Sequence, residues 1–462
     1  MTINNLPDEL LVEIFDWCRL SDEYGWNHRR RWYKPLQVCR RWRYVMLESA
    51  SRLKLRLLCS SPNPVAKMLM HSPPLPLIVS HHFGTFASTR YQEDILFALQ
   101  HSDRVCSIFI REWGLAGYKL FRALDKAFSM LETLFLSSKG YSTRILPNNF
   151  MAPHLRTLHL ENVDISAVSL FLINAANLIS LHLDHIPSFG YFSSASLVEH
   201  ISSAPRLENL SIKFIPCLPD MEMRLQRTQI TRVVLHSLRR LIYTGVSVYL
   251  ENFLALISTP LLQCFCVRLC WEHTYTLPHL SEFLDTIPNL DLRTAEVSFS
   301  STSVSITYHS GQPLVFLPYL KFQFTPVHDI FNQVASVVQI CNAIAPVLPV
   351  VQNLALENKE NRNLWIHHSH WYAFILSFGD VETVRIDMAL AVELSRVLHP
   401  FNRVLLPMLS ELVVVSLQDL ASNPFASFID ARRLAGHPID FRVIRQRPPP
   451  HPFSTPWSPP IY

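Results

Sequence analysis

The sequence predicts an α/β protein: a small N-terminal helical unit followed by an irregular solenoid of parallel strands and helices. Two observations predict the solenoid. An apolar pattern recurs twelve times between residues 105 and 417, and segments with helical periodicity lie between its copies. Composition agrees with a folded chain, because 49% of residues are hydrophobic. Only 17% are charged, against a usual share of about 25%.

The N-terminal unit begins NNLPDELLVEIFDWC. Pro7 suits the first turn of a helix, and Asp8 and Glu9 lie favourably at the positive end of its dipole. Apolar residues at positions 10, 11, 14, 15 and 18 then form one wide stripe, and PLQVCRRWRYVM predicts a second helix. Helices this short can barely cover such stripes, so we expect the surplus to face another protein. The alternative is an ordinary helical hairpin packed on the body.

This segment resembles an F-box, whose pattern opens with Leu-Pro, continues to an Ile-Phe pair and ends in a Val-Cys-x-x-Trp helix. The matching residues are Leu6, Pro7, Leu10, Ile14, Phe15, Val38, Cys39 and Trp42. The resemblance implies that they support or form a contact with the Skp-type adaptor of a cullin-based (SCF) ubiquitin ligase. Residues 19–34 make a longer connection than is usual in this family. The stretches LKLRLLCSSPNP, PPLPLIV and FIDARRL are similar to F-box proteins expanded in mushroom-forming fungi.

The body repeats the pattern apolar-x-x-apolar-x-apolar, for example LETLFL from Leu131 and LRTLHL from Leu155. Successive copies begin 23 to 34 residues apart. Leucine-rich repeats run about 20–29 residues, and each supplies a short strand and a returning helix or turn. The asparagine expected after the strand is mostly absent, although Asn162 follows one strand. The body therefore resembles a degenerate leucine-rich-repeat solenoid.

A doubly wound α/β domain is the alternative, since it also alternates strands with helices. It would be expected to carry a Gly-rich turn after an early strand. The chain has only 10 Gly, and none of them form such a turn, so the sequence favours the solenoid. Residues 303–316 break the repeat rhythm and predict a hairpin insertion.

The strand period of two predicts which side chains face away from the core. If Leu158 and Leu160 point inward, His159 and Glu161 point to the expected concave face. The same register exposes polar residues on later strands, which suits recognition of a polar protein surface. The candidate target-binding residues are His159, Glu161, His182, Asp184, Lys213, Arg240, Arg268, Glu296, Lys321 and Arg385. His159 and His182 recur at one repeat's distance with acids beside them, which predicts either an acid–imidazole cluster or, preferably, simple repeat homology.

No local pattern predicts a catalytic site, a metal site or a cofactor site. Cys264 and Cys266 share one strand face, but no matching Cys/His pair follows, so ordinary strand residues are favoured over zinc ligands. Their spacing also argues against an easy disulfide. The group His367, His368 and His370 is expected to lie in an extended surface turn. The prediction is a protein that is not an enzyme, with no cofactor and no metal site.

The charge distribution favours a protein partner, and the targeting patterns favour an intracellular location. Residues 1–60 hold 11 Lys/Arg and 7 Asp/Glu, while the other 402 residues hold 30 of each and sum to zero. A nucleic-acid partner is therefore disfavoured. The N-terminus has no apolar secretory segment, and the longest apolar stretch, 334–351, is broken by polar residues and prolines. With nine unpatterned cysteines, a cytoplasmic or nuclear location is expected, without a membrane partner.

These observations predict four segments: a helical F-box domain over 1–58, a linker over 59–90, the solenoid over 91–443, and a Pro-rich disordered tail over 444–462. The predicted function is substrate recognition for an SCF-type ubiquitin ligase. The F-box would bind the Skp-type adaptor and, through it, a cullin, while the solenoid would bind a target protein. The alternative is a repeat scaffold without a ligase role, in which the N-terminal helices only cap the solenoid.

Overall fold

The computed structural model forms two compact units, residues 1–192 with 199–215 and residues 193–198 with 216–462. The structure describes residues 6–20, 34–60, 65–82, 89–113, 117–138, 147, 149–163, 176–186, 191–214, 232–270, 275, 277–287, 292–300, 303–310, 319–325, 332–345, 351–359, 368–398, 405–416 and 423–445. Most of the long connection 19–34 and most of the tail 444–462 lie outside these residues.

The first unit opens with the predicted helices, α1 (Asp8–Leu20), the short 3-10 turn η3 (Pro35–Gln37) and α2 (Arg40–Glu48). Pro7 directly precedes α1, and its carbonyl oxygen accepts a hydrogen bond from the backbone N–H of Leu11. Cys39 caps α2 because its Sγ accepts from the backbone N–H of Trp42 at 3.4 Å. The first helix therefore begins close to its predicted start, whereas the second begins only at Arg40, because residues 35–37 form a separate 3-10 turn.

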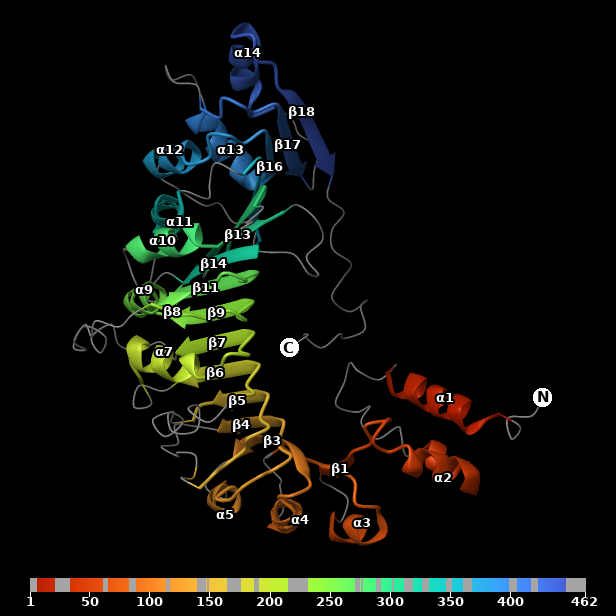
Figure 1. Ribbon diagram of the computed structural model, residues 1–462. Coiled ribbons are helices and arrows are strands. Elements are labelled where there is room, and N and C mark those ends of the chain that lie inside the picture. The colour runs from red at the N-terminus through yellow and green to blue at the C-terminus, as the bar shows by residue number, and fades with distance from the viewer. Residues whose placement is uncertain are drawn as a thin grey trace. The chain divides into compact units, whose positions relative to one another are not determined.

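Seven strands of the first unit follow one another in chain order and pair in parallel (Figure 1). They are β1 (Leu57–Ser60), β2 (Leu77–His82), β3 (Val105–Trp113), β4 (Thr133–Ser138), β5 (Thr157–Glu161), β6 (Ser180–Ile186) and β7 (Asn209–Phe214). The described helices near them are α3 (Val65–His71), α4 (Thr89–Gln100), α5 (Gly117–Ala123) and α7 (Ser194–Ser202). The parallel stacking expected from the repeat pattern is present.

The sheet begins earlier than the sequence predicted. β1 and β2 pair in parallel within the segment 57–82, and β2 continues onto β3. Residues 59–90 are therefore not simply a linker, because they hold part of β1, all of α3 and β2, and the first residues of α4. The apolar runs LLCS and LIVS are short and flanked by prolines, and they lack the full repeat pattern.

The core of the first unit follows the period of two. Leu158 and Leu160 of β5 are buried, as are Leu181 and Leu183 of β6. The side chains between them are only partly covered. Burying one leucine contributes roughly 1.5–3 kcal/mol, so two per strand across neighbouring strands stabilise the stack substantially. The opposite side of the strands carries alternating polar side chains. We call this side the polar face, in this unit and in the second.

The second unit has nine strands in the order β9-β11-β14-β13-β12-β15-β16-β17-β18. Their bounds are β9 (Arg240–Gly245), β11 (Cys264–Cys270), β12 (Thr294–Phe299), β13 (Val304–His309), β14 (Tyr319–Thr325), β15 (Asn353–Asn358), β16 (Thr383–Asp387), β17 (Glu411–Ser416) and β18 (Asp440–Arg445). A separate small pair joins β8 (Val233–Val234) to β10 (Ile257–Ser258).

The predicted hairpin insertion is present and changes the strand order. β13 runs antiparallel to both β12 and β14, and β14 pairs in parallel with β11. The expectation that all strands lie side by side in chain order is therefore wrong between β11 and β15. Hydrogen bonding between parallel β12 and β15 resumes the repeat beyond the hairpin.

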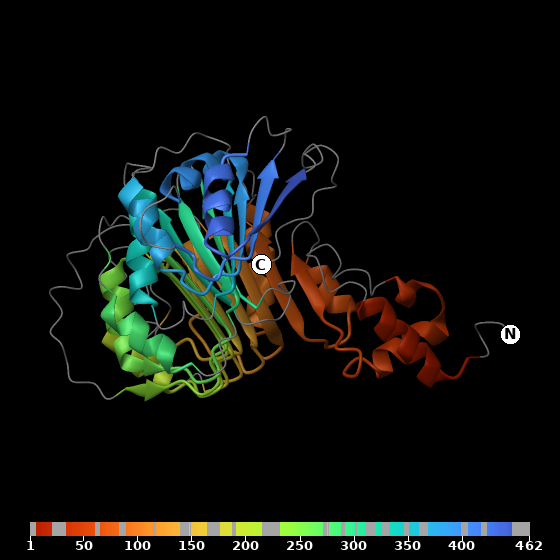
Figure 2. The same cartoon turned by 90° about the horizontal axis from the view of Figure 1, so that it is seen from above.

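Helices of the second unit are α9 (Ser247–Leu256), α10 (Pro278–Asp285), α11 (Asn332–Ala343), α12 (His368–Leu376), α13 (Met388–Val397) and α14 (Ala426–Leu434). In Figure 2, α9 to α12, coloured green to cyan, lie along one face of the strands. His368 and His370 lie in the first turn of α12, so the extended turn predicted for them is wrong, and His367 lies outside the described residues. Among the helices that the structure describes, none is long and apolar enough to cross a membrane.

Candidate functional site

Helix α1 carries two apolar stripes that differ in exposure. Leu11 and Phe15 are buried, whereas Leu10, Ile14 and Trp17 are 44%, 38% and 78% exposed. The exposed residues recur at i, i+4 and i+7, so they lie on one side of the helix. The apolar surplus predicted from the sequence is thus present at the surface of α1.

The buried stripe holds α1 against α2. The rings of Phe15 and Trp42 meet edge to face, with centroids 5.1 Å apart. At the start of the helix, Nη2 of Arg41 lies 2.6 Å from Oδ1 of Asp8 and also donates to the carbonyl oxygen of Leu6. The two helices therefore fix the orientation in which the exposed stripe is presented.

The residues predicted to contact an adaptor fall into two groups. Pro7, Leu10, Ile14 and Val38 are exposed. Phe15 is buried, while Leu6, Cys39 and Trp42 are partly covered. The exposed group is placed to touch another protein, whereas Phe15 and Trp42 stabilise the helix pair.

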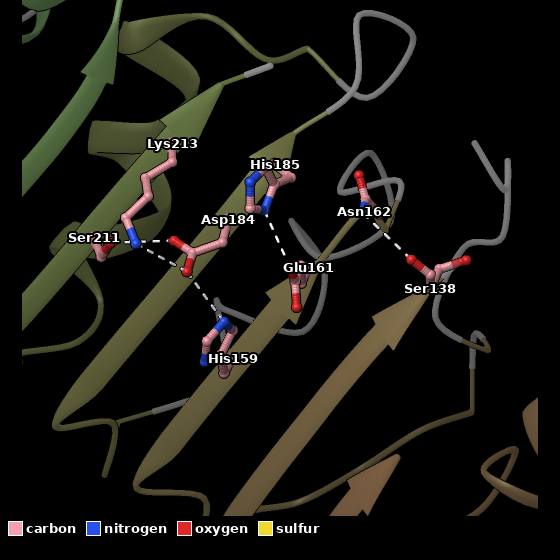
Figure 3. Close-up of polar contacts among 8 residues, drawn as sticks. All are labelled: Ser138, His159, Glu161, Asn162, Asp184, His185, Ser211 and Lys213. Carbon is pink, nitrogen blue, oxygen red and sulfur yellow. Dashed lines mark hydrogen bonds and ion pairs between the residues drawn. The ribbon is translucent and has the colours of Figure 1, made fainter. Parts of the chain in front are cut away.

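A second candidate site is the polar face of β5, β6 and β7, where an acid–imidazole cluster surrounds Asp184 (Figure 3). Nε2 of His159 and Nζ of Lys213 lie 3.2 Å and 3.1 Å from Oδ2 of Asp184. The hydroxyl of Ser211 donates to Oδ1 at 3.2 Å. His159 and Lys213 thus place two side-chain nitrogens beside the same carboxylate oxygen.

These contacts keep Asp184 ionised. Burial of the carboxyl would raise its pKa, but the hydrogen bond from His159 and the charge of Lys213 outweigh burial and lower the pKa to about 2. Asp184 therefore carries its negative charge at 9% exposure, paired with the positive charge of the more exposed Lys213. Repeat homology alone, which the sequence favoured, does not describe this arrangement.

Aromatic rings continue the cluster across the neighbouring strands. Register pairs Phe135 of β4 with His159 of β5, and His159 with His182 of β6. Their ring centroids are 4.4 Å and 5.3 Å apart. At the β3 side, the guanidinium of Arg111 lies 4.9 Å from the centroid of the Phe135 ring. A row of flat rings bordered by charges is a surface that can hold a protein side chain by stacking and by hydrogen bonds.

The remaining target-binding candidates lie in the second unit. Arg268 donates to Oε1 of Gln323 at 2.8 Å and 3.1 Å, and Glu296 lies 3.1 Å from Nε2 of His309. Arg240 and Arg385 are exposed, and Lys321 is partly exposed. Of the ten candidates, the structure brings His159, Asp184 and Lys213 into polar contact and places the ring of His182 beside that of His159.

Two residues of the candidate sites were missed from the sequence. Trp17 was left out because it falls outside the F-box pattern, although the spacing from Leu10 and Ile14 would have shown it. His185 lies 3.2 Å from Oε1 of Glu161 and has a positive φ of 53°, a conformation that period-two reasoning does not anticipate. Asn162 has a similar backbone, with φ 54°, and its amide donates to the carbonyl oxygen of Ser138 at 3.3 Å.

No group of three or more His, Cys, Asp or Glu side chains that could hold a metal ion occurs among the described residues. The two candidate sites differ in character, since one is apolar and helical and the other is polar and built on strands.

No protein-family model matches the chain, and no curated protein matches it. One similar solved structure is the leucine-rich repeat-containing protein LegL7 from Legionella pneumophila, with 12% sequence identity over 82% of this chain and 98% of that chain. Its TM-score is 0.30, which is too low to support any argument. The assignments below therefore depend on the chain's own residues.

Proposed function

We propose that the chain is a substrate-recognition adaptor of an SCF-type ubiquitin ligase, which binds the Skp-type adaptor through residues 1–58 and a target protein through its polar face. The observation that carries this proposal is the exposed apolar stripe of α1 with Leu10 and Ile14, together with exposed Val38. Large apolar side chains gathered on one helix face are a typical contact for a partner helix or groove.

The contribution of such a protein to ubiquitin transfer is positional rather than chemical, so we propose that it is not an enzyme. Binding the ligase at one end and the target at the other raises the effective concentration of target lysines near the catalytic partner. A protein target suits the mixed charges and rings around His159 and Asp184. Action in the cytoplasm or nucleus, through a cullin and without nucleic acid or membrane, is part of the same proposal.

The test is capture of a purified Skp-type adaptor by the full chain and by two charge-insertion variants, Leu10→Glu and Ile14→Glu. A carboxylate pressed into an apolar contact costs a few kcal/mol, so each variant is expected to bind at least about tenfold more weakly. The matched control is Leu434→Glu, which places the same charge at an exposed leucine of α14.

Thermal unfolding of the variants separates a lost contact from a lost fold. Because Leu10 and Ile14 are exposed, both variants are expected to unfold at the temperature of the parent chain. Equal adaptor binding by the parent and both variants would contradict the proposal, as would an adaptor that does not bind the parent.

The alternative function is a repeat scaffold with no ligase role, in which only the polar face binds a partner. The contacts of Asp184 with two neighbouring strands favour this role equally, since they do not involve the N-terminal helices. A chain that captures a target but not the adaptor would support the scaffold.

A further inference from the structure

Two cysteines of β11 hold their sulfur atoms in contact on the polar face of the second unit. Cys264 and Cys266 are two residues apart on a strand, and their Sγ atoms are 3.8 Å apart. The sequence predicts ordinary strand residues at these positions, because residues two apart on a strand are too widely spaced for an easy disulfide. The structure shows that the side chains turn toward each other.

Positive charges flank this dithiol on both neighbouring strands. Register places Arg240 of β9 and Tyr319 of β14 directly beside Cys264. The same register places Lys321 of β14 beside Cys266. A thiolate between a guanidinium and an ammonium group is stabilised by both.

The surroundings shift the pKa values of the two thiols in opposite directions. The pKa of Cys264 is lowered to about 7, mainly by the hydrogen bond from Cys266. The Tyr319 hydroxyl and Arg240 lower this pKa further, whereas burial raises it. The pKa of Cys266 is raised, because it donates that hydrogen bond and would otherwise place a second negative charge beside the first. Cys264 is therefore the more acidic thiol of the pair.

Two other described cysteines lack these features. Cys59 and Cys341 are buried, and burial raises the pKa of each thiol to about 12. They are inert thiols in the same molecule. The difference in surroundings makes Cys264 and Cys266 a distinct chemical site.

We propose that Cys264 and Cys266 form an oxidisable dithiol that reacts with peroxides, with Cys264 as the nucleophile and Cys266 as the resolving thiol. Cys264 is only 5% exposed and Cys266 is partly exposed, so the oxidant is a small one such as hydrogen peroxide. This site is independent of the proposed ligase function.

The reaction has two steps. The Cys264 thiolate attacks one peroxide oxygen: an S–O bond forms, the O–O bond breaks, and the released hydroxide takes a proton from solvent to become water. The sulfur of Cys264 is thereby oxidised to a sulfenic acid and the peroxide is reduced. The sulfur of Cys266 then attacks the Cys264 sulfur; the S–S bond forms, the S–O bond breaks, and the thiol proton leaves with the hydroxide as a second water.

The product requires local movement of β11. Residues two apart on one strand have Cα atoms about 6.6 Å apart, at the upper end of the range of about 4.4–6.8 Å that a disulfide bridges, and the two sulfur atoms must close from 3.8 Å to about 2.05 Å. A metal ion fits less well, because among the described residues no third His, Cys, Asp or Glu ligand joins the two sulfurs and cationic side chains lie on both sides.

The test begins with the intact, unmodified chain. Limited alkylation with iodoacetamide at pH 7, read by peptide mass spectrometry, is expected to label Cys264 at least about tenfold faster than Cys59 or Cys341. Hydrogen peroxide is then expected to remove two hydrogen atoms from the peptide that holds both cysteines, and a reductant is expected to restore them. Cys266→Ser should leave Cys264 as a sulfenic acid that a 1,3-dione traps.

Arg240→Gln tests whether the positive charge of Arg240 stabilises the Cys264 thiolate, and it leaves both sulfur atoms in place. Arg240 is exposed, so the fold should tolerate the change, and loss of its charge is expected to slow labelling of Cys264 at pH 7 by about two- to fivefold. The control is Arg433→Gln, which removes the charge of an exposed arginine on α14 and should leave the rate unchanged. The titratable and charged groups that face Cys264 from the packed strands are Arg240, Tyr319 and Lys321, together with Cys266 on its own strand.

Two results would overturn the proposal. Labelling of Cys264 no faster than that of Cys59 and Cys341 would remove its nucleophilic role. Oxidation of Cys264 to sulfinic acid in the parent chain, with Cys266 still a free thiol, would remove the resolving role.

Discussion

The Asp184 carboxylate on β6 lies 3.2 Å from Nε2 of His159 on β5 and is one strand away from Lys213 on β7. A single buried charge thus joins three consecutive repeats of the first unit. Since each repeat buries its face only against its neighbours, a polar link of this kind contributes directly to the cohesion of the stack.

Replacing Asp184 by Asn should therefore lower stability in a pH-dependent way. The folded pKa of Asp184 is about 2, below the unfolded value of about 3.9. Its contribution is fully present above the unfolded pKa and is lost as pH falls through the folded pKa. We expect Asp184→Asn to cost about 2 kcal/mol at pH 7 and less at pH 3, measured by urea denaturation.

Glu161→Gln is the control for this effect. Glu161 contacts the exposed side chain of His185, so its removal is expected to cost under about 1 kcal/mol. An Asp184→Asn variant as stable as the parent at pH 7, or one with the same loss at pH 3, would contradict the assigned role.

A second link between repeats joins α9 to α10. The buried carboxylate of Glu251 accepts from the backbone N–H of His279 at 2.6 Å and from that of Leu280 at 3.1 Å. It therefore caps the first turn of the next helix, where backbone N–H groups have no partner within the helix. We expect Glu251→Ala to cost about 2 kcal/mol, because two N–H groups lose their acceptor.

Hydrogen exchange of the His279 and Leu280 amides reports this cap directly. Both amides should exchange faster in Glu251→Ala, whereas Glu282→Gln, an exposed change on the same helix, should leave them unchanged. Unaltered amide protection in the alanine variant would show that another group caps α10.

The third prediction compares a buried residue that stabilises the N-terminal helices with an exposed residue on the same helix. Phe15 is buried against Trp42, so Phe15→Ala is expected to cost about 3–5 kcal/mol and to unfold α1 and α2 locally. Limited proteolysis should then cut within residues 8–48 before it cuts the strands. Ile14→Ala, at the adjacent exposed position, should leave the pattern of proteolysis unchanged. Equal protease sensitivity of the two variants would show that Phe15 does not stabilise the helix pair more than Ile14 does.

Much of the fold follows from sequence periodicity. Alternating burial along β5, with Leu158 and Leu160 inward and His159 outward, is local information that a period of two carries. The F-box-like pattern likewise separates into a buried Phe15 and an exposed Ile14, because a helix turn fixes which residues share a side. The sequence alone therefore predicts which side chains reach a surface.

What periodicity does not carry is which strand lies next to which. The apolar alternation of β12 is the same whether it pairs with β11 or with β13, so the reversed order between β11 and β15 could not be predicted. Side-chain direction is equally non-local: the contact of Glu251 with His279 spans 28 residues, and the approach of Cys264 to Cys266 depends on rotamers. These features arise from tertiary packing.

The last prediction concerns Trp371 of α12, which is fully buried and meets Phe299 and Phe374 edge to face at 6.0 Å and 5.7 Å. Its indole Nε1 has no hydrogen-bond partner among the described residues. Trp371→Ala should cost about 3–5 kcal/mol because it leaves a large cavity. Trp371→Phe should cost under about 2 kcal/mol, since removing the unpaired N–H offsets part of the lost packing. Urea midpoints compare both with Trp17→Phe, an exposed control; equal losses for the two Trp371 variants would indicate that the indole N–H is paired.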